Sequence, residues 1–176
     1  MNRQSIKNKV YLNIAREVAL LSKDKNSQIG AVIVGKDGTP VSWGYNGTVQ
    51  GFDDALIPHS REYETLSYME GDQVVKFKEN KYPFMEHAER NALDFADPTK
   101  LAGSTLYVTG FPCEGCALRI AKRKVARVVI AEPPASVDPD SSVGVDVIKS
   151  KFIFVQAGIE VYVGNKKLPL SKHVIV

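Results

Sequence analysis

Two short clusters of residues that can bind metal or move protons lie in the middle of the chain. His87 and Glu89 form the first cluster, and Cys113 and Cys116 form the second. One imidazole and two thiolates match the number and softness of the protein ligands at a catalytic zinc whose fourth position is open to water. The Cys-x-x-Cys spacing also lets both sulfurs converge from one helical turn. The sequence therefore predicts a zinc site made by His87, Cys113 and Cys116.

Each cluster is expected at the start of a helix, where the helix dipole and the free amide groups stabilise thiolates. Zinc lowers the pKa of a bound water to about 7, which produces a nucleophile. The reaction still needs a group that carries protons. Glu89 lies two residues beyond His87, close enough to reach such a water without binding the metal. We therefore expect Glu89 to be the general acid and base.

Each cluster alone also has a simpler interpretation. Cys113-x-x-Cys116 has the spacing of a thioredoxin-like redox motif, and His-x-Glu by itself most often marks the start of a surface helix. The coincidence of both clusters, with Pro112 before the cysteines and a predicted strand before that, favours zinc. Because these are the chain's only two cysteines and they lie together, they cannot join distant segments as a disulfide framework does.

The composition is that of an ordinary globular protein with a small basic excess. Hydrophobic residues make up 44% of the 176 residues, charged residues make up 24%, and the formal net charge is +3. This charge suits an anionic small molecule and falls short of the basic patch of a dedicated nucleic-acid binder. There is no apolar run of the roughly 18 residues that a membrane span needs, and residues 1–9 are too polar for a signal peptide. We expect a cytoplasmic protein, in the host cytoplasm if a phage encodes it.

The hydrophobic pattern around the two clusters predicts alternating strands and helices. Apolar residues at helical spacing predict a helix over 6–21, through Ile6, Val10, Ile14, Val18 and Leu21. Strands are expected at 29–34, 41–45, 104–109, 127–131 and 160–163, and further helices at 86–95, 113–124 and 145–156. Residues 46–84 and 132–142 show little periodicity and are expected to be loops.

This order of elements predicts an α/β fold. We expect a mixed sheet of about five strands covered by helices on both faces. The chain is predicted to be a single domain over residues 1–176, with a long insert at about 47–84.

Most of the chain, from Lys23 to Val163, resembles the cytidine and deoxycytidylate deaminase superfamily, and more narrowly the deoxycytidylate deaminases of phages and animals. His-x-Glu followed by Pro-Cys-x-x-Cys is the signature of zinc-dependent nucleobase deaminases. Further similar segments occur in the same order at 26–34, 44–47, 82–84, 105–109 and 157–161. Gly-Tyr-Asn-Gly at 44–47 and the long segment before His87 favour this group over the tRNA adenosine and riboflavin-pathway deaminases. The resemblance implies a three-layer cytidine-deaminase-like fold.

The resemblance also implies an activity, the hydrolytic deamination of dCMP to dUMP and ammonia, which supplies thymidylate synthesis. One zinc ion would be held by His87, Cys113 and Cys116, and Glu89 would pass a proton from water to ring N3. The backbone N–H of Ala88 would bind the base O2, and the backbone C=O of Phe111 would bind the leaving amino group. Other expected substrate contacts are made by Asn46 to sugar and base, Asn26 near the nucleotide, and Lys25 to phosphate.

Relatives in this family are often allosteric homohexamers. The resemblance implies activation by dCTP with Mg²⁺, inhibition by dTTP, and a regulatory role for the loop at Gly44, Tyr45 and Gly47. The chain departs from the family pattern at 48–51, where a proline-containing continuation is common, and at 122–125, where a small residue and glycine are usual. It has no third cysteine for the additional structural zinc of some phage relatives.

Three alternatives remain open at the level of sequence. The enzyme could prefer dCTP or a 5-modified dCMP, because the pocket around C5 is not readable from one sequence. It could edit cytosine or adenosine in a polynucleotide, although the 46–84 segment lacks the interleaved aromatics and arginines of a single-strand groove. It could also be a redox or structural zinc module without catalytic activity. No membrane partner is expected, and a nucleic-acid partner is disfavoured.

Overall fold

The computed structural model describes residues 2–133, 138 and 140–172 of the chain. It contains two compact units, which are described separately. The first comprises Met1–Asn46 and His87–Val176, and the second comprises Gly47–Glu86. Among the residues predicted to form the site, only Gly47 belongs to the second unit. The predicted loop at 132–142 falls partly outside the described residues. No helix in the described part of the chain is long and apolar enough to span a membrane.

A mixed six-stranded sheet organises the first unit, in the order β10-β9-β8-β7-β1-β2. The strands are β1 (Gly30–Val34), β2 (Pro40–Tyr45), β7 (Thr105–Val108), β8 (Arg127–Ile130), β9 (Glu160–Val163) and β10 (Lys166–Lys167). β7, β8 and β9 are parallel, whereas β1 is antiparallel to both of its neighbours. The mixed sheet confirms the prediction, and the two-residue β10 is the strand that the hydrophobic pattern did not indicate.

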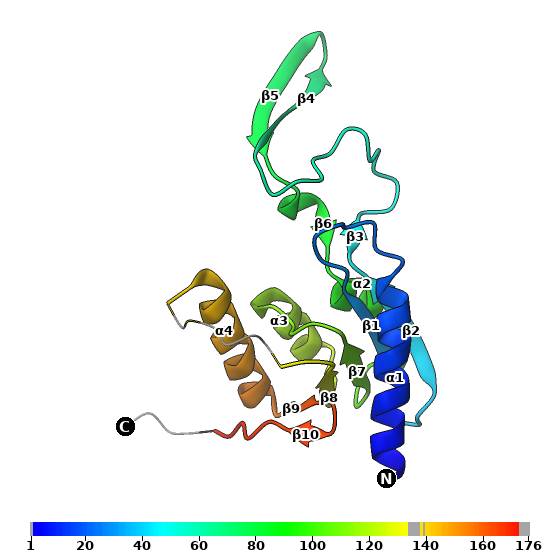
Figure 1. Cartoon of the computed structure of the whole chain (residues 1–176). Helices are drawn as coiled ribbons and strands as arrows, with labels where there is room; N and C mark the ends of the chain where they lie inside the picture. Colours follow the sequence, from blue (N-terminus) through cyan, green and yellow to red (C-terminus); the bar gives the residue numbers. More distant parts are fainter. Residues whose placement is uncertain (1, 134–137, 139, 173–176) are drawn as a thin grey trace. The chain divides into compact units, whose positions relative to one another are not determined.

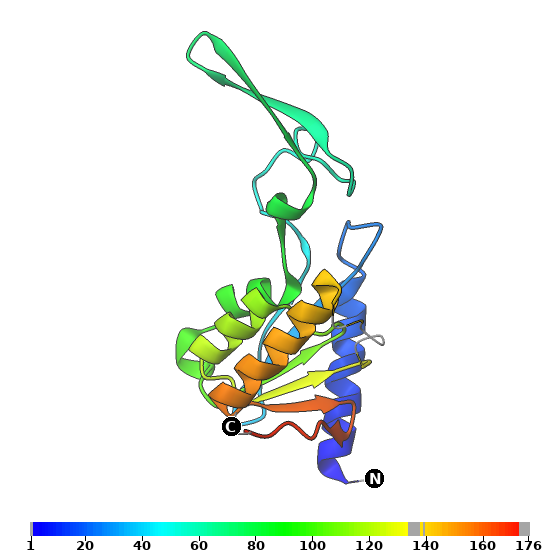
Figure 2. The same cartoon turned by 90° about the vertical axis from the view of Figure 1, so that its left-hand side faces the viewer.

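Helices cover both faces of this sheet (Figure 1, Figure 2). The α1 helix (Arg3–Ala19) lies on one face, and α2 (Ala88–Asp94), α3 (Glu114–Lys122) and α4 (Ser142–Ala157) lie on the other. Alternate strand residues pack into two separate cores, because successive strand side chains point to opposite faces. Val32, Tyr107 and Val129 pack with α1, while Ile33 and Val128 belong to the core beneath α2, α3 and α4. The three-layer architecture is thereby confirmed.

The inward face of α1 differs from the predicted one. Ile6, Val10 and Ile14 are exposed, whereas Leu12 and Ala15 are buried against the sheet. Small residues on the inner face let the helix approach the sheet closely, so the face with the larger side chains is turned outward. The predicted helix is present but ends at Ala19 instead of Leu21; of its predicted apolar stripe, Val18 is buried, whereas Ile6, Val10 and Ile14 are exposed.

Gly30 is the point of closest approach between α1 and β1. A Cβ atom at this position would lie 2.0 Å from the backbone oxygen of Ala15 and 2.6 Å from the backbone nitrogen of Ala19. We expect Gly30→Ala to lower the free energy of unfolding by about 3 kcal/mol, because only the helix backbone could give way. Denaturant titration measures the change. Gly164→Ala is the control: its φ is +55° and its Cβ would meet nothing within 4 Å, so strain alone should cost about 1 kcal/mol.

A charged cluster joins the three strands at the other edge of the sheet. Glu160 on β9 accepts a hydrogen bond from Arg127 on β8 at 3.0 Å and pairs with Lys167 on β10. The bond from Lys167, followed by that from Arg127, holds the pKa of the Glu160 carboxyl below its ordinary value. A folded-state pKa below the unfolded one adds stability above the unfolded pKa, and this stability is lost as the pH falls through the folded pKa.

We expect Glu160→Gln to be slightly less stable than the wild type at neutral pH and equally stable in acid. The loss at pH 7 should be under about 1 kcal/mol, since the carboxylate is 37% exposed and therefore screened by solvent. Urea titrations between pH 7 and pH 3 measure the difference between the two proteins. A difference that stays constant down to pH 3 would show that the substitution acts through packing instead of charge.

The second unit corrects the prediction that residues 46–84 form a loop. It contains the hairpin of β4 (Glu64–Glu70) and β5 (Gln73–Glu79), together with β3 (Gly47–Thr48), which pairs with β6 (Met85–Glu86). A short 3-10 turn, η1 (Tyr82–Phe84), precedes β6; a second, η2 (Pro98–Lys100), lies in the first unit. The hairpin's signal was the Gly71-Asp72 dipeptide, with Gly71 at φ +61°, between two runs of alternating residues. The prediction of a single domain with an insert remains a prediction.

Candidate active site

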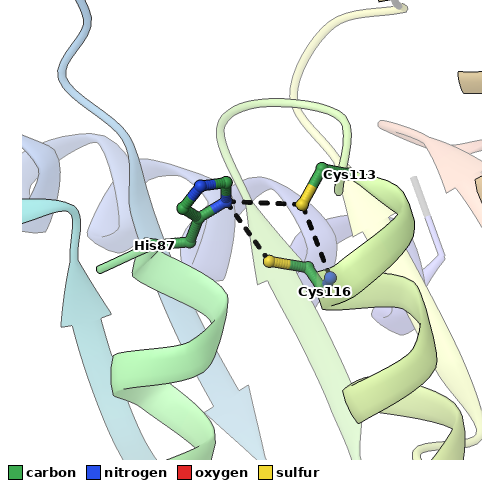
Figure 3. A group of neighbouring side chains, drawn as sticks. All are labelled: His87, Cys113 and Cys116. Carbon is green, nitrogen blue, oxygen red and sulfur yellow. Dashed lines mark hydrogen bonds between the residues drawn. The ribbon is translucent and has the colours of Figure 1, made fainter. Parts of the chain in front are cut away.

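The predicted zinc ligands come together at the starts of two helices. His87 is the N-cap of α2 and Cys113 is the N-cap of α3, and Cys116 follows in the first turn of α3. His87 Nδ1 lies 3.4 Å from the sulfur of Cys113 and 3.4 Å from that of Cys116 (Figure 3). The three candidate ligand atoms all lie within 4.8 Å of one another.

This arrangement fits a tetrahedral zinc ion. Bond lengths of about 2.3 Å to sulfur and about 2.0 Å to nitrogen place neighbouring ligand atoms roughly 3.5 Å apart in a tetrahedron. The nitrogen–sulfur distances of 3.4 Å are close to this value. In the described part of the chain, no other group of three histidine, cysteine or acidic side chains converges in this way. The three side chains would occupy three of the four coordination positions of the ion, and a water can occupy the fourth.

Hydrogen bonds among the three groups shift their pKa values in different directions. Hydrogen bonds from Cys116 and from His87 lower the pKa of Cys113 to about 3. The bond to Cys113 also raises the pKa of His87. The pKa of Cys116 is raised, because it donates to Cys113 and is buried. The shifts favour the thiolate form of Cys113, whereas a divalent cation would have to displace protons from Cys116 and His87.

Glu89 lies beside the ligands with its carboxyl group inside the protein. It is only 4% exposed, and burial raises its pKa above the ordinary glutamate value. A raised pKa makes this carboxylate a stronger base than an ordinary glutamate, which suits a group that takes a proton and passes it on. It is not among the three atoms that converge on the metal position. Its placement is therefore compatible with the proton-transfer role expected from the sequence.

The site depends on two glycines, of which Gly44 was expected only in a regulatory loop and Gly115 was assigned no role from the sequence. A Cβ on Gly44 of β2 would lie 2.4 Å from the backbone nitrogen of Ala92, so Gly44 lets α2 pack directly on the sheet. A Cβ on Gly115 would lie 2.6 Å from Nη2 of Arg90, so the guanidinium packs directly over the Cys-x-x-Cys turn. The signal for both was a glycine beside the motif residues, and only the packing shows what each contacts.

Asp146 also supports the cysteine turn, from a distant part of the chain. Its Oδ1 accepts a hydrogen bond of 2.8 Å from the backbone nitrogen of Glu114, the first residue of α3. Lys149, one turn further along α4, forms a 3.0 Å ion pair with the Glu114 side chain. The start of α3 is thus held by α4. A sequence pattern gives no sign of this contact, because the partners are 32 positions apart.

Asn46 has a supporting role in this structure. Its Oδ1 accepts from the backbone nitrogen of Ile29 at 2.7 Å, and its Nδ2 donates to the carbonyl of Ser27 at 2.8 Å. Both ends of the amide therefore hold the segment before β1. Asn26 and Lys25 lie on this segment and are exposed, with the backbone nitrogen of Asn26 bound to Asp24 Oδ1 at 2.8 Å.

The remaining predicted residues lie on several elements. Ala88 is buried in the first turn of α2, where amide groups have no acceptor within the helix. Phe111 lies between β7 and α3, and its ring meets that of Phe154 edge-on at 6.4 Å. The carbonyl of Tyr45 accepts from Asn91 Nδ2 at 2.8 Å, which ties the end of β2 to α2. Gly47 pairs with Glu86 in the second unit.

One histidine and two cysteines at two helix starts, beside a buried glutamate, form the donor set of a catalytic zinc site with one position open to water. The family model of the cytidine and deoxycytidylate deaminase zinc-binding region matches residues 5–132. The chain belongs to this family.

Several relatives in the family are named as deoxycytidylate deaminases. A probable one from Caenorhabditis elegans is 37% identical over 126 residues, covering 72% of this chain and 57% of the relative. The human deoxycytidylate deaminase is 34% identical, covering 68% of this chain and 61% of that protein. The chain thus matches about three fifths of the length of these animal proteins. The deoxycytidylate deaminase of phage T4 is 30% identical, with 92% of both chains covered.

A solved structure shares the fold along most of the chain. The dCMP deaminase of cyanophage S-TIM5, in complex with dCMP and dUMP, has a TM-score of 0.59 and 27% identity. The match covers 92% of this chain and 97% of that one.

Proposed function

We propose that this chain catalyses the zinc-dependent hydrolytic deamination of dCMP to dUMP and ammonia. The observation that carries the proposal is the convergence of His87, Cys113 and Cys116 within 4.8 Å, beside the buried carboxyl of Glu89. The full-length match to the phage T4 enzyme and the dCMP- and dUMP-bound structure of the cyanophage enzyme support this substrate. The product would supply thymidylate synthesis.

Zinc held by the three ligands would supply a water with a pKa of about 7. Glu89 would carry each proton that is transferred in the reaction. Its carboxylate takes a proton from the attacking water and gives it to ring N3, which makes C4 more electrophilic. Once the water oxygen is bonded to C4, Glu89 takes the second proton from that hydroxyl and gives it to the amino group, so that the C4–N bond breaks, ammonia leaves and the C4 carbonyl of dUMP forms. Burial supports this cycle, because a carboxyl group with a raised pKa accepts the proton of the water more readily and so can carry it to N3.

Other groups in the chain would hold the nucleotide during these transfers. The amide of Ala88 would donate to the base O2, and the carbonyl of Phe111 would accept from the amino group. Asn46 would reach sugar and base, although both ends of its amide already hold residues 27–29. We therefore propose that Asn46 acts on the substrate partly by holding residues 27–29 in place. Asn26 and Lys25, just before these residues, would contact the nucleotide and its phosphate.

We extend the proposal to regulation and assembly on the family resemblance. The enzyme would be a cytoplasmic homohexamer, in the host cytoplasm if encoded by a phage. dCTP with Mg²⁺ would activate it and dTTP would inhibit it, through the loop at Gly44, Tyr45 and Gly47. Residues 1–176 would work as one catalytic domain with 47–84 as an insert.

A substrate comparison tests the proposal and separates it from its alternatives. Ammonia release is measured from dCMP, dCTP, 5-methyl-dCMP, deoxycytidine and a cytosine-containing oligonucleotide, each with and without Mg²⁺ and dCTP. We expect dCMP to have the highest kcat/KM. Equal rates on deoxycytidine would contradict a monophosphate requirement. Turnover of the oligonucleotide without turnover of dCMP would favour the polynucleotide-editing alternative instead.

A further inference from the structure

The outward face of α1 carries an apolar stripe. Ile6, Val10 and Ile14 are 49%, 46% and 40% exposed and follow one another at four-residue spacing along the helix. The opposite side of α1 is buried against the sheet through Leu12 and Ala15, and the buried Val18 borders the stripe, about 40° around the helix from Ile14. Large aliphatic side chains at helical spacing on an exposed face are typical of a helix that packs against a partner.

The sequence of this outward face reads symmetrically about Val10. Ile6 and Ile14 each lie four positions from Val10, and Arg3 and Glu17 each lie seven positions from it. At 100° per residue, all five fall within one side of the helix, opposite the side that is buried against the sheet. Arg3 and Glu17 are both exposed, and they carry opposite charges.

We propose that two copies of this chain pair through α1 in an antiparallel arrangement, with a two-fold axis at Val10. In that pairing Val10 meets its own counterpart, Ile6 meets the partner's Ile14, and Arg3 faces the partner's Glu17 on both sides of the axis. An isologous contact requires a self-complementary surface of this kind. An unrelated partner would not require Arg3 and Glu17 to lie at equal distances from Val10. Their complementary charges therefore favour a second copy of this chain as the partner. The proposal rests on the homohexamer proposed above and assigns one of its contacts: a monomeric wild type would contradict both, whereas the charge-reversal variants described below test the α1 contact alone.

Substituting the central residue tests the contact. Val10→Asp would place two carboxylates together on the axis, and the assembly should weaken on the order of a hundredfold. Sedimentation velocity of the zinc-loaded full chain should then show a smaller species at micromolar concentration. The control is Leu20→Asp: Leu20 is 65% exposed, so it is the more exposed residue, but it lies off the stripe. Circular dichroism of both variants monitors folding.

Charge reversal tests the antiparallel pairing directly. It remains a test of the proposal even if Val10→Asp does not fold. Arg3→Glu alone and Glu17→Arg alone should each weaken the assembly about fivefold, because each sets like charges opposite one another. The double variant should restore wild-type association. A Val10→Cys protein should also form a disulfide with its own copy under mild oxidation. The proposal is overturned by a monomeric wild type, or by a double variant that stays as weak as the single ones.

Discussion

Glu89→Ala is expected to lower kcat for dCMP by about 10² to 10⁴-fold while the protein keeps its zinc. The carboxyl of Glu89 is buried next to the ligands but is not one of the three converging ligand atoms. Its loss should therefore remove proton transfer without removing the metal. Ammonia release measures the rate, and metal analysis of the same preparation measures the zinc content.

A control with the same change in charge distinguishes this role from a general electrostatic effect. Glu114 lies in the first turn of α3, where its side chain pairs with Lys149 at the surface. Glu114→Gln should retain most of the turnover. If Glu89→Ala kept more than about a tenth of the wild-type kcat, another group would have to carry the protons.

Cys116→Ser is expected to reduce bound zinc from about one ion per chain to less than about a tenth of that, and to abolish turnover. A hydroxyl is a much poorer ligand than a thiolate for a borderline-soft cation. Cys116 is completely buried in the core beneath α3. The other cysteine of the chain, Cys113, is itself a predicted ligand, so no further thiol can replace Cys116. Zinc content after dialysis and the melting temperature with added zinc measure the effect.

The wild type treated with a chelator provides the comparison for this variant. Chelation should reproduce the loss of turnover, and added zinc should restore it in the wild type but not in Cys116→Ser. Ala121→Ser places a hydroxyl on the same helix away from the ligands and should bind zinc normally. Full zinc binding by Cys116→Ser would remove Cys116 from the ligand set.

The local elements around the site could be predicted because their signals are local. Short β-branched runs indicated β1 and β8, and the helices beginning at His87 and Cys113 followed from where the two motifs lie. The convergence of the two motifs followed from chemistry, because one imidazole and two thiolates act together only when they meet at one ion. The structure brings these three residues together.

Contacts between distant segments could not be predicted in the same way. The hydrogen bond from Glu114 to Asp146 depends on how α4 packs against α3. The hydrogen bonds of the Asn46 amide depend on where residues 27–29 run after α1 ends. The spacing of apolar residues predicted α1 but not which side faces the sheet: Ile6, Val10 and Ile14 are exposed, whereas the close packing on Gly30 places Ala15 and Ala19 inward.

Titrating the metal-free protein with zinc while following conversion of dCMP to dUMP is the most direct measurement of the central claim. Turnover should rise in proportion to bound zinc and reach its plateau at about one ion per chain, with one ammonia released per dUMP formed. Full turnover before zinc is added, or no turnover at one bound zinc per chain, would contradict a zinc-dependent dCMP deaminase built on His87, Cys113 and Cys116.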